Sequence, residues 1–343
     1  MSCGADDHAS NNMDEVQLNR PTVPSNEEAP KRAFLGALQN CGDIVEPSTI
    51  IRPAIKDIDA KDGGRLVLVS EYANDIYDHL YKLEAEQPIR NNHLAGHREI
   101  DHKMRAILID SISQMHWGFQ FKAETFQLTV AIIDRYLQAV QNTERDKLQL
   151  VGVTALIIAA KYEETVQKNI NHFVSITDET YSASEIRAME QQILRAIDYN
   201  LSRPLPIDFL RRFTKAAGAQ REHHIMSKYF VELASVDYDL ASRKPSEIAA
   251  AALFLSLHLL NGNHLAGTGF NDQLWTPTLA HYSRYTAAHL RPITRQIAKL
   301  AREAPQAELQ ALHKKHQGLQ FFEIANRAEL SGPLINSIVG QNN

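Results

Sequence analysis

The sequence predicts an all-α protein made of two similar helical halves, and three observations support this prediction. Between residues 70 and 328, apolar residues recur at spacings of three and four, whereas the alternation typical of β-strands is rare. Pro204 and Pro206 divide this zone into two halves, because proline interrupts helices. Each half contains one apolar stretch rich in small residues, at 150–160 and 248–260, which predicts a helix surrounded by other helices.

The segments around the two apolar stretches have their own signals. Residues 1–65 are rich in Asn, Asp, Glu, Pro and Ser and show no sustained period, so we predict that they are disordered. Residues 186–197 place their apolar side chains on one helical face, and Thr180 or Ser182 is positioned to cap that helix. Residues 329–343 return to Gly, Asn and Ser, which predicts a flexible tail.

The composition excludes several classes of protein. The chain of 343 residues is long enough for two domains, and it has 44% apolar and 22% charged residues, as ordinary globular proteins do. A net charge of −5 argues against a dedicated nucleic-acid-binding protein, which usually carries a basic face. With only Cys3 and Cys41, disulfide frameworks and cysteine-rich zinc folds are excluded, and we expect an intracellular protein. The start lacks an apolar signal core, and the apolar runs are shorter than the roughly 20 residues that span a bilayer.

Motifs that would indicate catalysis are missing from the sequence. There is no glycine-rich phosphate loop, no Gly-x-Ser-x-Gly nucleophile turn and no His-Glu-x-x-His zinc motif. His313 and His316 are spaced to share a helix face, but no further ligand is evident, so we expect solvated histidines there and at His93 rather than a metal site. Neither a metal nor a cofactor is predicted, which favours a binding or regulatory protein over an enzyme.

Two ionic residues interrupt apolar helical stretches, where a charge is costly unless it is paired. Arg105 lies within Met-Arg-Ala-Ile-Leu-Ile-Asp at 104–110, and Asp134 lies within Val-Ala-Ile-Ile-Asp-Arg-Tyr-Leu at 130–137. Since an uncompensated buried charge costs about 3–5 kcal/mol, we predict that Arg105 and Asp134 pair and lock two helices of the first half together. The alternative is that both side chains are separately solvated on exposed faces.

A second group of charges follows the buried helix of the first half. Lys161, Tyr162, Glu163 and Glu164 come directly after its apolar stretch, and Glu190 lies on the next amphipathic segment. One interpretation is that Lys161 only complements the helix dipole. The other is that a rigid buried helix presents these side chains to a partner.

An ordered series of motifs makes the chain similar to mitotic cyclins, most closely to those of the B type. The series extends over residues 70–328 and includes Glu-Tyr-Ala-Asn-Asp-Ile-Tyr at 71–77, Met-Arg-Ala-Ile-Leu at 104–108, Lys-Tyr-Glu-Glu at 161–164 and Arg-Pro-Leu-Pro at 203–206. The resemblance implies two tandem cyclin boxes, at 70–201 and 202–328, each of about five helices around a central buried helix.

The resemblance implies a regulatory subunit without catalysis of its own. Proteins of this family bind and activate a mitotic cyclin-dependent kinase and so control entry into and progress through mitosis or meiosis. The positions that match the kinase-binding surface of the family are Lys161, Glu190, Tyr162, Leu150, Glu163, Glu164, Tyr72 and Ile76. The competing interpretations are a nucleic-acid-binding twin-box adaptor of the transcription factor B kind, which would need a basic face, and a scaffold that has lost kinase binding.

The resemblance also covers a groove that docks substrate motifs of the Arg-x-Leu kind, and this chain departs from the family there. The family's tryptophan is replaced by Ser111 and its acidic residue by Gln114, which removes the aromatic floor of the groove and the partner for arginine. We therefore expect weakened docking of kinase substrates with kinase activation retained. The residues that match the groove are Met104, Ile107, Leu108, Leu148 and Gln149.

The N-terminal segment contains Arg32, Leu35 and Asn40 at the spacing of a destruction box. In the unstructured head of a mitotic cyclin, such a motif implies recognition by the anaphase-promoting complex and ubiquitination at a nearby lysine, for which Lys31 and Lys56 are candidates. The resemblance further implies a protein of the nucleus and cytoplasm, with no nucleic acid and no membrane among its partners.

Overall fold

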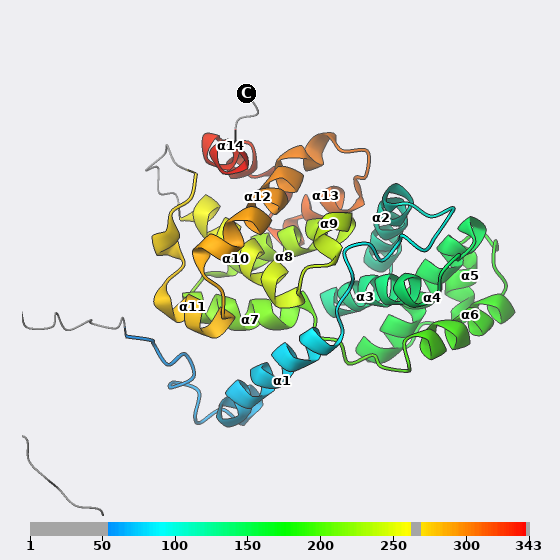
Figure 1. The fold of residues 1–343 in the computed structure, drawn as a ribbon, viewed down its shortest axis with the longest axis horizontal. Helices are drawn as coiled ribbons and strands as arrows, with labels where there is room; N and C mark the ends of the chain where they lie inside the picture. Colours follow the sequence, from blue (N-terminus) through cyan, green and yellow to red (C-terminus); the bar gives the residue numbers. More distant parts are fainter. Residues whose placement is uncertain (1–53, 262–268, 341–343) are drawn as a thin grey trace, which may run out of the picture. The chain divides into compact units, whose positions relative to one another are not determined.

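The computed structural model describes residues 54–261 and 269–340, and within these ranges the chain is built from α-helices and short 3₁₀ turns, without a β-strand (Figure 1). The all-α prediction is therefore confirmed. Helix α1 (Ala73–Glu86) precedes two bundles. The first consists of α2 (His102–Gly118), α3 (Ala123–Ala139), α4 (Leu148–Glu163), α5 (Ile170–Ile176) and α6 (Ala183–Ala196). The second consists of α7 (Pro206–Ala217), α8 (Arg221–Val236), α9 (Tyr238–Ala241), α10 (Pro245–Leu260), α11 (Pro277–Ser283) and α12 (Ala287–Glu303), followed by α13 (Ala311–His316) and α14 (Pro333–Val339).

Helix α4 is the centre of the first bundle, as its apolar sequence predicts. Residues 150–160 are all buried, and α4 packs against α2, α3 and α6 (Figure 1). Glycine allows α2 to approach closely, because a Cβ added to Gly152 would lie 2.6 Å from Cδ1 of Leu108. Helix α6 begins with a capping box in which the Oγ of Ser182 accepts from the backbone N–H of Glu185 at 3.2 Å. Ser182 is therefore the cap, and Thr180 is not.

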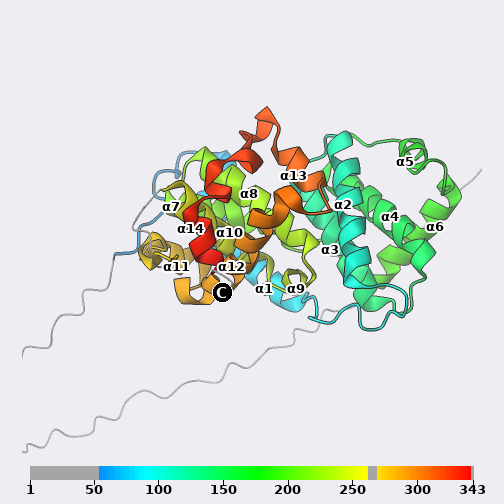
Figure 2. The same ribbon diagram turned by 90° about the horizontal axis from the view of Figure 1, so that it is seen from above.

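Helix α10 occupies the corresponding place in the second bundle. Pro245 stands in its first turn, where the missing N–H would have no helical partner, and residues 245–259 are all buried. Helix α10 packs against α7, α8 and α12 (Figure 2). The chain enters this bundle through Pro204 and Pro206, and Pro206 is the first residue of α7.

Part of the head that we predicted to be disordered is folded onto the second bundle. The prediction covered residues 1–65, of which 1–53 lie outside the described residues. Ile58 is buried, and Asp59 forms an ion pair with Arg212 of α7. The prediction is wrong for this stretch because it rested on local composition, whereas one apolar side chain and one paired carboxylate hold the segment on a core that already exists.

Residues 329–340 differ from the flexible tail that we predicted at 329–343, of which 341–343 lie outside the described residues. Residues 333–339 form α14, in which Ile335 and Ile338 are buried, and the helix packs on α12 (Figure 2). The polar composition of the segment concealed these two isoleucines, which lie three residues apart and therefore share one helical face.

Candidate functional site

The end of helix α4 places a charged side chain beside α6. Lys161 lies in the last turn of α4, and its Nζ is 2.5 Å from Oε1 of Glu190. The two side chains are 53% and 17% exposed, so the ion pair is open to solvent on one side. Ile186 and Ile193 are buried and hold α6 against the bundle. The structure thus brings together Lys161 and Glu190, which the sequence analysis had placed on one surface.

Exposed apolar side chains occur at the end of α4 and on α1. Tyr162, which follows Lys161, is 53% exposed. Tyr72, just before α1, and Ile76, in its first turn, are 59% and 43% exposed, and a spacing of four places them on one helical face. Grouped apolar side chains that no core residue covers are typical of protein-binding surfaces, where aromatic residues are enriched.

The two glutamates that follow Tyr162 interact with the first bundle itself. Oε1 of Glu164 accepts from the backbone N–H of Lys122 at 2.7 Å and from the hydroxyl of Thr125 at 2.6 Å, so this carboxylate caps the N-terminus of α3. The carbonyl oxygen of Glu163 accepts from Nζ of Lys122 at 2.8 Å. Burial and the nearby carboxylate of Glu124 raise the pKa of Glu163. Glu164 thus supports the start of α3, and a partner contact at this half-buried residue stays a prediction.

Leu150 lies on the same face of α4 as Lys161, three helical turns earlier. Its side chain is only 4% exposed, and it borders a depression together with Met189. It lies 161 − 150 = 11 residues before Lys161, which is about 16 Å along the axis. A partner contact at Leu150 stays a prediction.

The predicted buried ion pair joins α2 to α3. Nε and Nη2 of Arg105 donate to Oδ1 and Oδ2 of Asp134 at 2.6 and 2.7 Å, and both residues are buried. Burial alone would raise the pKa of Asp134, but the Arg105 guanidinium outweighs this effect and lowers the pKa to about 2. The pair is therefore confirmed, and the alternative of two separately solvated side chains is wrong.

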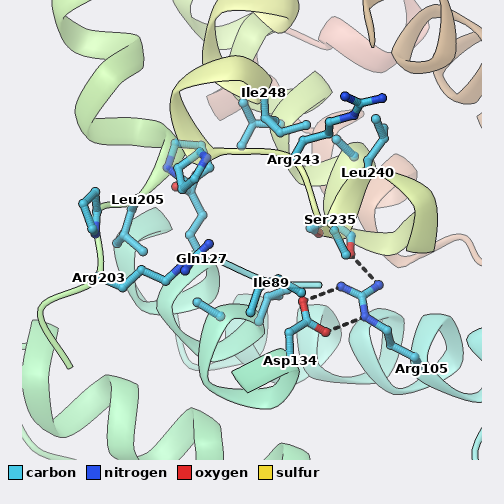
Figure 3. A pocket seen from close by; sticks show the side chains of 18 residues that line it. Ile89, Arg105, Gln127, Asp134, Arg203, Leu205, Ser235, Leu240, Arg243 and Ile248 are labelled. Atoms are coloured by element: carbon cyan, nitrogen blue, oxygen red, sulfur yellow. Dashed lines mark hydrogen bonds and ion pairs between the residues drawn. The ribbon is translucent and has the colours of Figure 1, made fainter. Parts of the chain in front are cut away.

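Arg105 also connects the two bundles, which the sequence did not indicate. Its Nη1 donates to the carbonyl oxygens of Ser235 and Val236, at the end of α8, at 3.1 and 3.3 Å. A cavity of about 90 Å³ lies beside the pair, with Arg203 and Gln127 on its other side (Figure 3). One buried guanidinium thus holds α2, α3 and the end of α8 together.

A second buried charge network lies where α8 meets α13. Oε1 and Oε2 of Glu232 accept from Nζ of Lys315 at 2.9 and 2.8 Å, and Oε2 is 2.9 Å from Nε2 of His316. Burial would raise the pKa of Glu232, but Lys315 and His316 lower it. The prediction of solvated histidines is wrong, because His316 is fully buried and His313 and His93 are nearly so. The available signal was Glu232, which interrupts an apolar run of α8.

The residues of the predicted docking groove lie on α2 and at the start of α4. Ile107 is 55% exposed and Gln149 is exposed, whereas Met104 is half-buried. Leu108 and Leu148 are buried and form the base of this surface. The five residues therefore combine an apolar base with an exposed rim.

The two departures from the family pattern lie further along α2. Ser111 is half-buried, and Gln114 is exposed and donates from Nε2 to Oδ2 of Asp110 at 3.3 Å. The other oxygen of Asp110 accepts from the backbone N–H of Ala311 at 2.9 Å. Position 111 thus offers no aromatic ring, and position 114 offers no charge.

The described residues contain neither a metal site nor a membrane-spanning helix, and the predicted destruction box lies outside them. Within residues 54–261 and 269–340, no group of three or more His, Cys, Asp or Glu side chains is arranged to hold a metal ion. In that part of the chain, no helix combines the length and the apolar character needed to cross a membrane. Arg32, Leu35 and Asn40 of the predicted destruction box lie outside the described residues.

Comparison with known families identifies both bundles. The model of the cyclin N-terminal domain matches residues 75–202, and that of the cyclin C-terminal domain matches residues 204–330. Among solved structures, a viral cyclin from herpesvirus saimiri shares the fold with a TM-score of 0.56 at 20% identity, over 65% of this chain and 96% of that one. The fold is thus a tandem of cyclin domains, and the first match includes all of helix α1 except its first two residues.

Relatives of known name place the chain within this fold class. It is 69% identical over 287 residues to the G2/mitotic-specific cyclin-B of Drosophila melanogaster, which covers 84% of this chain and 54% of that protein. It is 41% identical over 317 residues to the G2/mitotic-specific cyclin-B of Spisula solidissima, which covers 92% of this chain and 71% of that protein. The chain therefore spans about half the length of the Drosophila relative. It belongs to the cyclin family and, within it, to the B-type mitotic cyclins.

Proposed function

We propose that the chain is the regulatory subunit of a mitotic cyclin-dependent kinase, which it binds and activates, and that it has no catalysis of its own. The observation that carries this proposal is the ion pair of Lys161 and Glu190 at the end of α4, beside the exposed Tyr162. The sequence relatives are named for a role in mitosis, and the exposed Tyr72 and Ile76 on α1 supply a second apolar contact.

The physical properties of this surface suit a partner that must be held in one conformation. Helix α4 is buried along its length, so it presents Lys161 from a rigid support. The ion pair already orders Lys161 and Glu190, which reduces the conformational entropy lost on binding. An active kinase requires a glutamate of its mobile helix to pair with the lysine of the ATP site. A subunit that binds this arrangement more tightly than the inactive one shifts the kinase population towards the active state.

The proposal is tested with a double variant at the ion pair. Lys161→Ala with Glu190→Ala is expected to abolish co-purification with a mitotic kinase. The reason is that truncating a charged contact that binding buries costs about 2–5 kcal/mol. The matched control is Arg291→Ala with Asp272→Ala, another ion pair at 2.5 Å, which lies in the second bundle. Wild-type binding by the first double variant would refute the assignment of this surface.

The same preparations separate the competing functions. Histone phosphorylation by the bound kinase is expected to rise with added chain and to remain unchanged by the control variant. A complex that forms without a rise in phosphorylation would indicate a scaffold. Binding to DNA without binding to the kinase would indicate an adaptor of the transcription factor B kind.

We also propose that the lifetime of the protein is set by its destruction box, through ubiquitination by the anaphase-promoting complex. The spacing of Arg32, Leu35 and Asn40 in a polar N-terminal segment supports this proposal. Lys31 and Lys56 are the candidate lysines for attachment of ubiquitin. Arg32→Ala with Leu35→Ala is expected to lengthen the half-life in mitotic extract, whereas Leu38→Ala in the same segment leaves it unchanged. Equal half-lives would contradict the proposal.

We propose a distribution between nucleus and cytoplasm, which follows from the role as a mitotic kinase subunit. Imaging of a fluorescent fusion through the cell cycle is expected to show signal in both compartments. Signal confined to one compartment throughout would contradict this expectation.

A further inference from the structure

Residues 56–62, which we call the strap, lie on helix α11 of the second bundle. The backbone N–H of Lys56 donates to the hydroxyl of Thr278 at 3.2 Å, and that of Ile58 donates to the hydroxyl of Tyr282 at 3.4 Å. The side chain of Ile58 is buried. The strap is therefore attached to the second bundle, and residues 63–72 connect it to α1.

Arg212 of α7 connects the strap to α1. Its Nη1 donates to Oδ1 of Asp59 at 2.7 Å, and its Nη2 donates to Oδ1 of Asn74 on α1 at 3.0 Å and lies 2.6 Å from Oδ2 of Asp59. It also lies over the rings of Tyr77 on α1 and Tyr282 on α11, 5.1 and 4.8 Å from their centres. Because the Arg212 side chain is only 4% exposed, these partners replace water around its charge.

The acidic side chains of the strap are matched to two cations of α7. Nζ of Lys215 is 2.6 Å from Oδ1 of Asp59 and 2.5 Å from Oδ2 of Asp62. Burial would raise the pKa of Asp59, but its hydrogen bonds to Arg212 and Lys215 lower it. Asp59 is therefore ionised at neutral pH and is shared by the two cations.

Helix α1 is attached to the second bundle by partly buried side chains and by hydrogen bonds. Of its 14 residues, only Ala73 and Glu84 are buried, whereas Tyr77, Leu80 and Tyr81 pack partly buried against the core. The hydroxyl of Tyr77 also donates to the carbonyl oxygen of Asp208 at 3.0 Å, and that of Tyr81 donates to the carbonyl oxygen of Tyr282 at 3.0 Å. Because few of its residues are fully enclosed, the contacts that the strap and Arg212 add contribute to its orientation.

We propose that the strap and Arg212 form a clamp that fixes α1 in the orientation in which Tyr72 and Ile76 meet the partner. Asp59 and Arg212 are then positioning residues, which act on binding through α1 and touch no partner themselves. This inference rests on the proposed function, since it assigns the kinase as that partner. A binding surface that is correctly oriented for only part of the time has its affinity reduced by that fraction.

The first measurement is hydrogen exchange of the full chain without a kinase. Asp59→Asn is expected to accelerate exchange in residues 73–86 and to leave α4 and α10 unchanged. The control is Asp272→Asn, which removes the carboxylate of a different Arg–Asp pair in the second bundle. Unchanged exchange in 73–86, or faster exchange throughout the second bundle, would overturn the clamp.

The second measurement is a double-mutant cycle on the affinity for a mitotic kinase. Asp59→Asn is expected to raise the dissociation constant about tenfold if α1 is correctly oriented about a tenth of the time without the clamp. In a background with Tyr72→Ala and Ile76→Ala, the same change is expected to have less than about a twofold effect, because both contacts that α1 would position are already lost. Asp59→Glu, which keeps the charge, is expected to restore most of the affinity.

The outcomes of the cycle distinguish the clamp from other roles. A tenfold effect that persists in the background with Tyr72→Ala and Ile76→Ala would mean that the strap touches the kinase directly, which overturns the proposal. Equal affinities of wild type and Asp59→Asn would overturn it as well. If the wild-type chain binds no mitotic kinase, the proposed function fails, and the hydrogen-exchange result still decides whether the clamp exists.

Discussion

Replacing Asp134 with alanine is expected to destabilise the protein strongly, because it leaves a buried cation without its carboxylate. The Arg105 side chain is fully buried and would lose two acceptors at 2.6 and 2.7 Å, keeping only the carbonyl oxygens of Ser235 and Val236 at 3.1 and 3.3 Å. Breaking a buried ion pair by removing one partner costs about 3–5 kcal/mol. For the 208 + 72 = 280 residues that the structure describes, an unfolding entropy of about 2.1 cal/mol/K per residue means that each kcal/mol lowers the melting temperature by about 1.7 °C. We therefore expect a fall of about 5–9 °C.

Calorimetry of the purified chain provides the assay, with Asp272→Ala as the control. Asp272 also pairs with an arginine, Arg291, but both side chains are more than two-fifths exposed. Pairs of this kind contribute about 0.2–1 kcal/mol, so the control is expected to lower the melting temperature by less than about 2 °C. A melting temperature of Asp134→Ala equal to that of the control would refute the reasoning.

The pH dependence of stability offers an independent check on the same pair. Burial raises the pKa of Asp134, but the Arg105 guanidinium lowers it by a larger amount. The pKa in the folded chain is therefore about 2, compared with about 3.9 in the unfolded chain. Because the folded pKa is the lower one, the stabilisation is fully present above about pH 4 and is lost as the pH falls towards 2. The difference in unfolding free energy between wild type and Asp134→Asn is therefore expected to narrow between pH 4 and pH 2. A constant difference over that range would contradict the assignment.

Three further predictions concern the docking groove, the core and the C-terminal helix. In fluorescence anisotropy, an Arg-x-Leu peptide is expected to bind the wild type with a dissociation constant above about micromolar, and micromolar binding would contradict this expectation. Ser111→Trp with Gln114→Glu is expected to tighten the binding of the peptide. Gly152→Ala is expected to cost about 1–3 kcal/mol in urea unfolding, because its Cβ would lie 2.6 Å from Leu108. Ile335→Ala is expected to cost about 2–5 kcal/mol in the same assay, and a loss below 0.5 kcal/mol would show that α14 contributes little.

Features with a strong local signal could be predicted from the sequence. The apolar stretches at 150–160 and 248–260 indicated the central helices α4 and α10, because a helix without a polar face has to be enclosed. Arg105 and Asp134 were recognised because each interrupts an apolar run, where an unpaired charge is too costly. The Lys161–Glu190 surface was anticipated from the position of Lys161 at the end of a buried helix.

Features that depend on neighbours distant in the chain were missed. His316 appeared to be a surface residue because its partner Glu232 lies 316 − 232 = 84 positions away, so that no local spacing connects them. Residues 54–65 and 329–343 appeared unstructured because their composition is polar. The ion pair of Asp59 with Arg212 and the packing of α14 on α12 form only in the folded chain, so local composition does not indicate them.

The sequence by itself determined the helical class, the two halves, the family and the buried pair of Arg105 with Asp134, because periodicity, proline positions and misplaced charges are local properties. Only the tertiary structure decided what those charges hold together. It showed that Arg105 reaches the end of α8 and that Glu164 caps α3. Side-chain direction and burial depend on which helices pack against each other, and hydrophobic periodicity alone does not specify that arrangement.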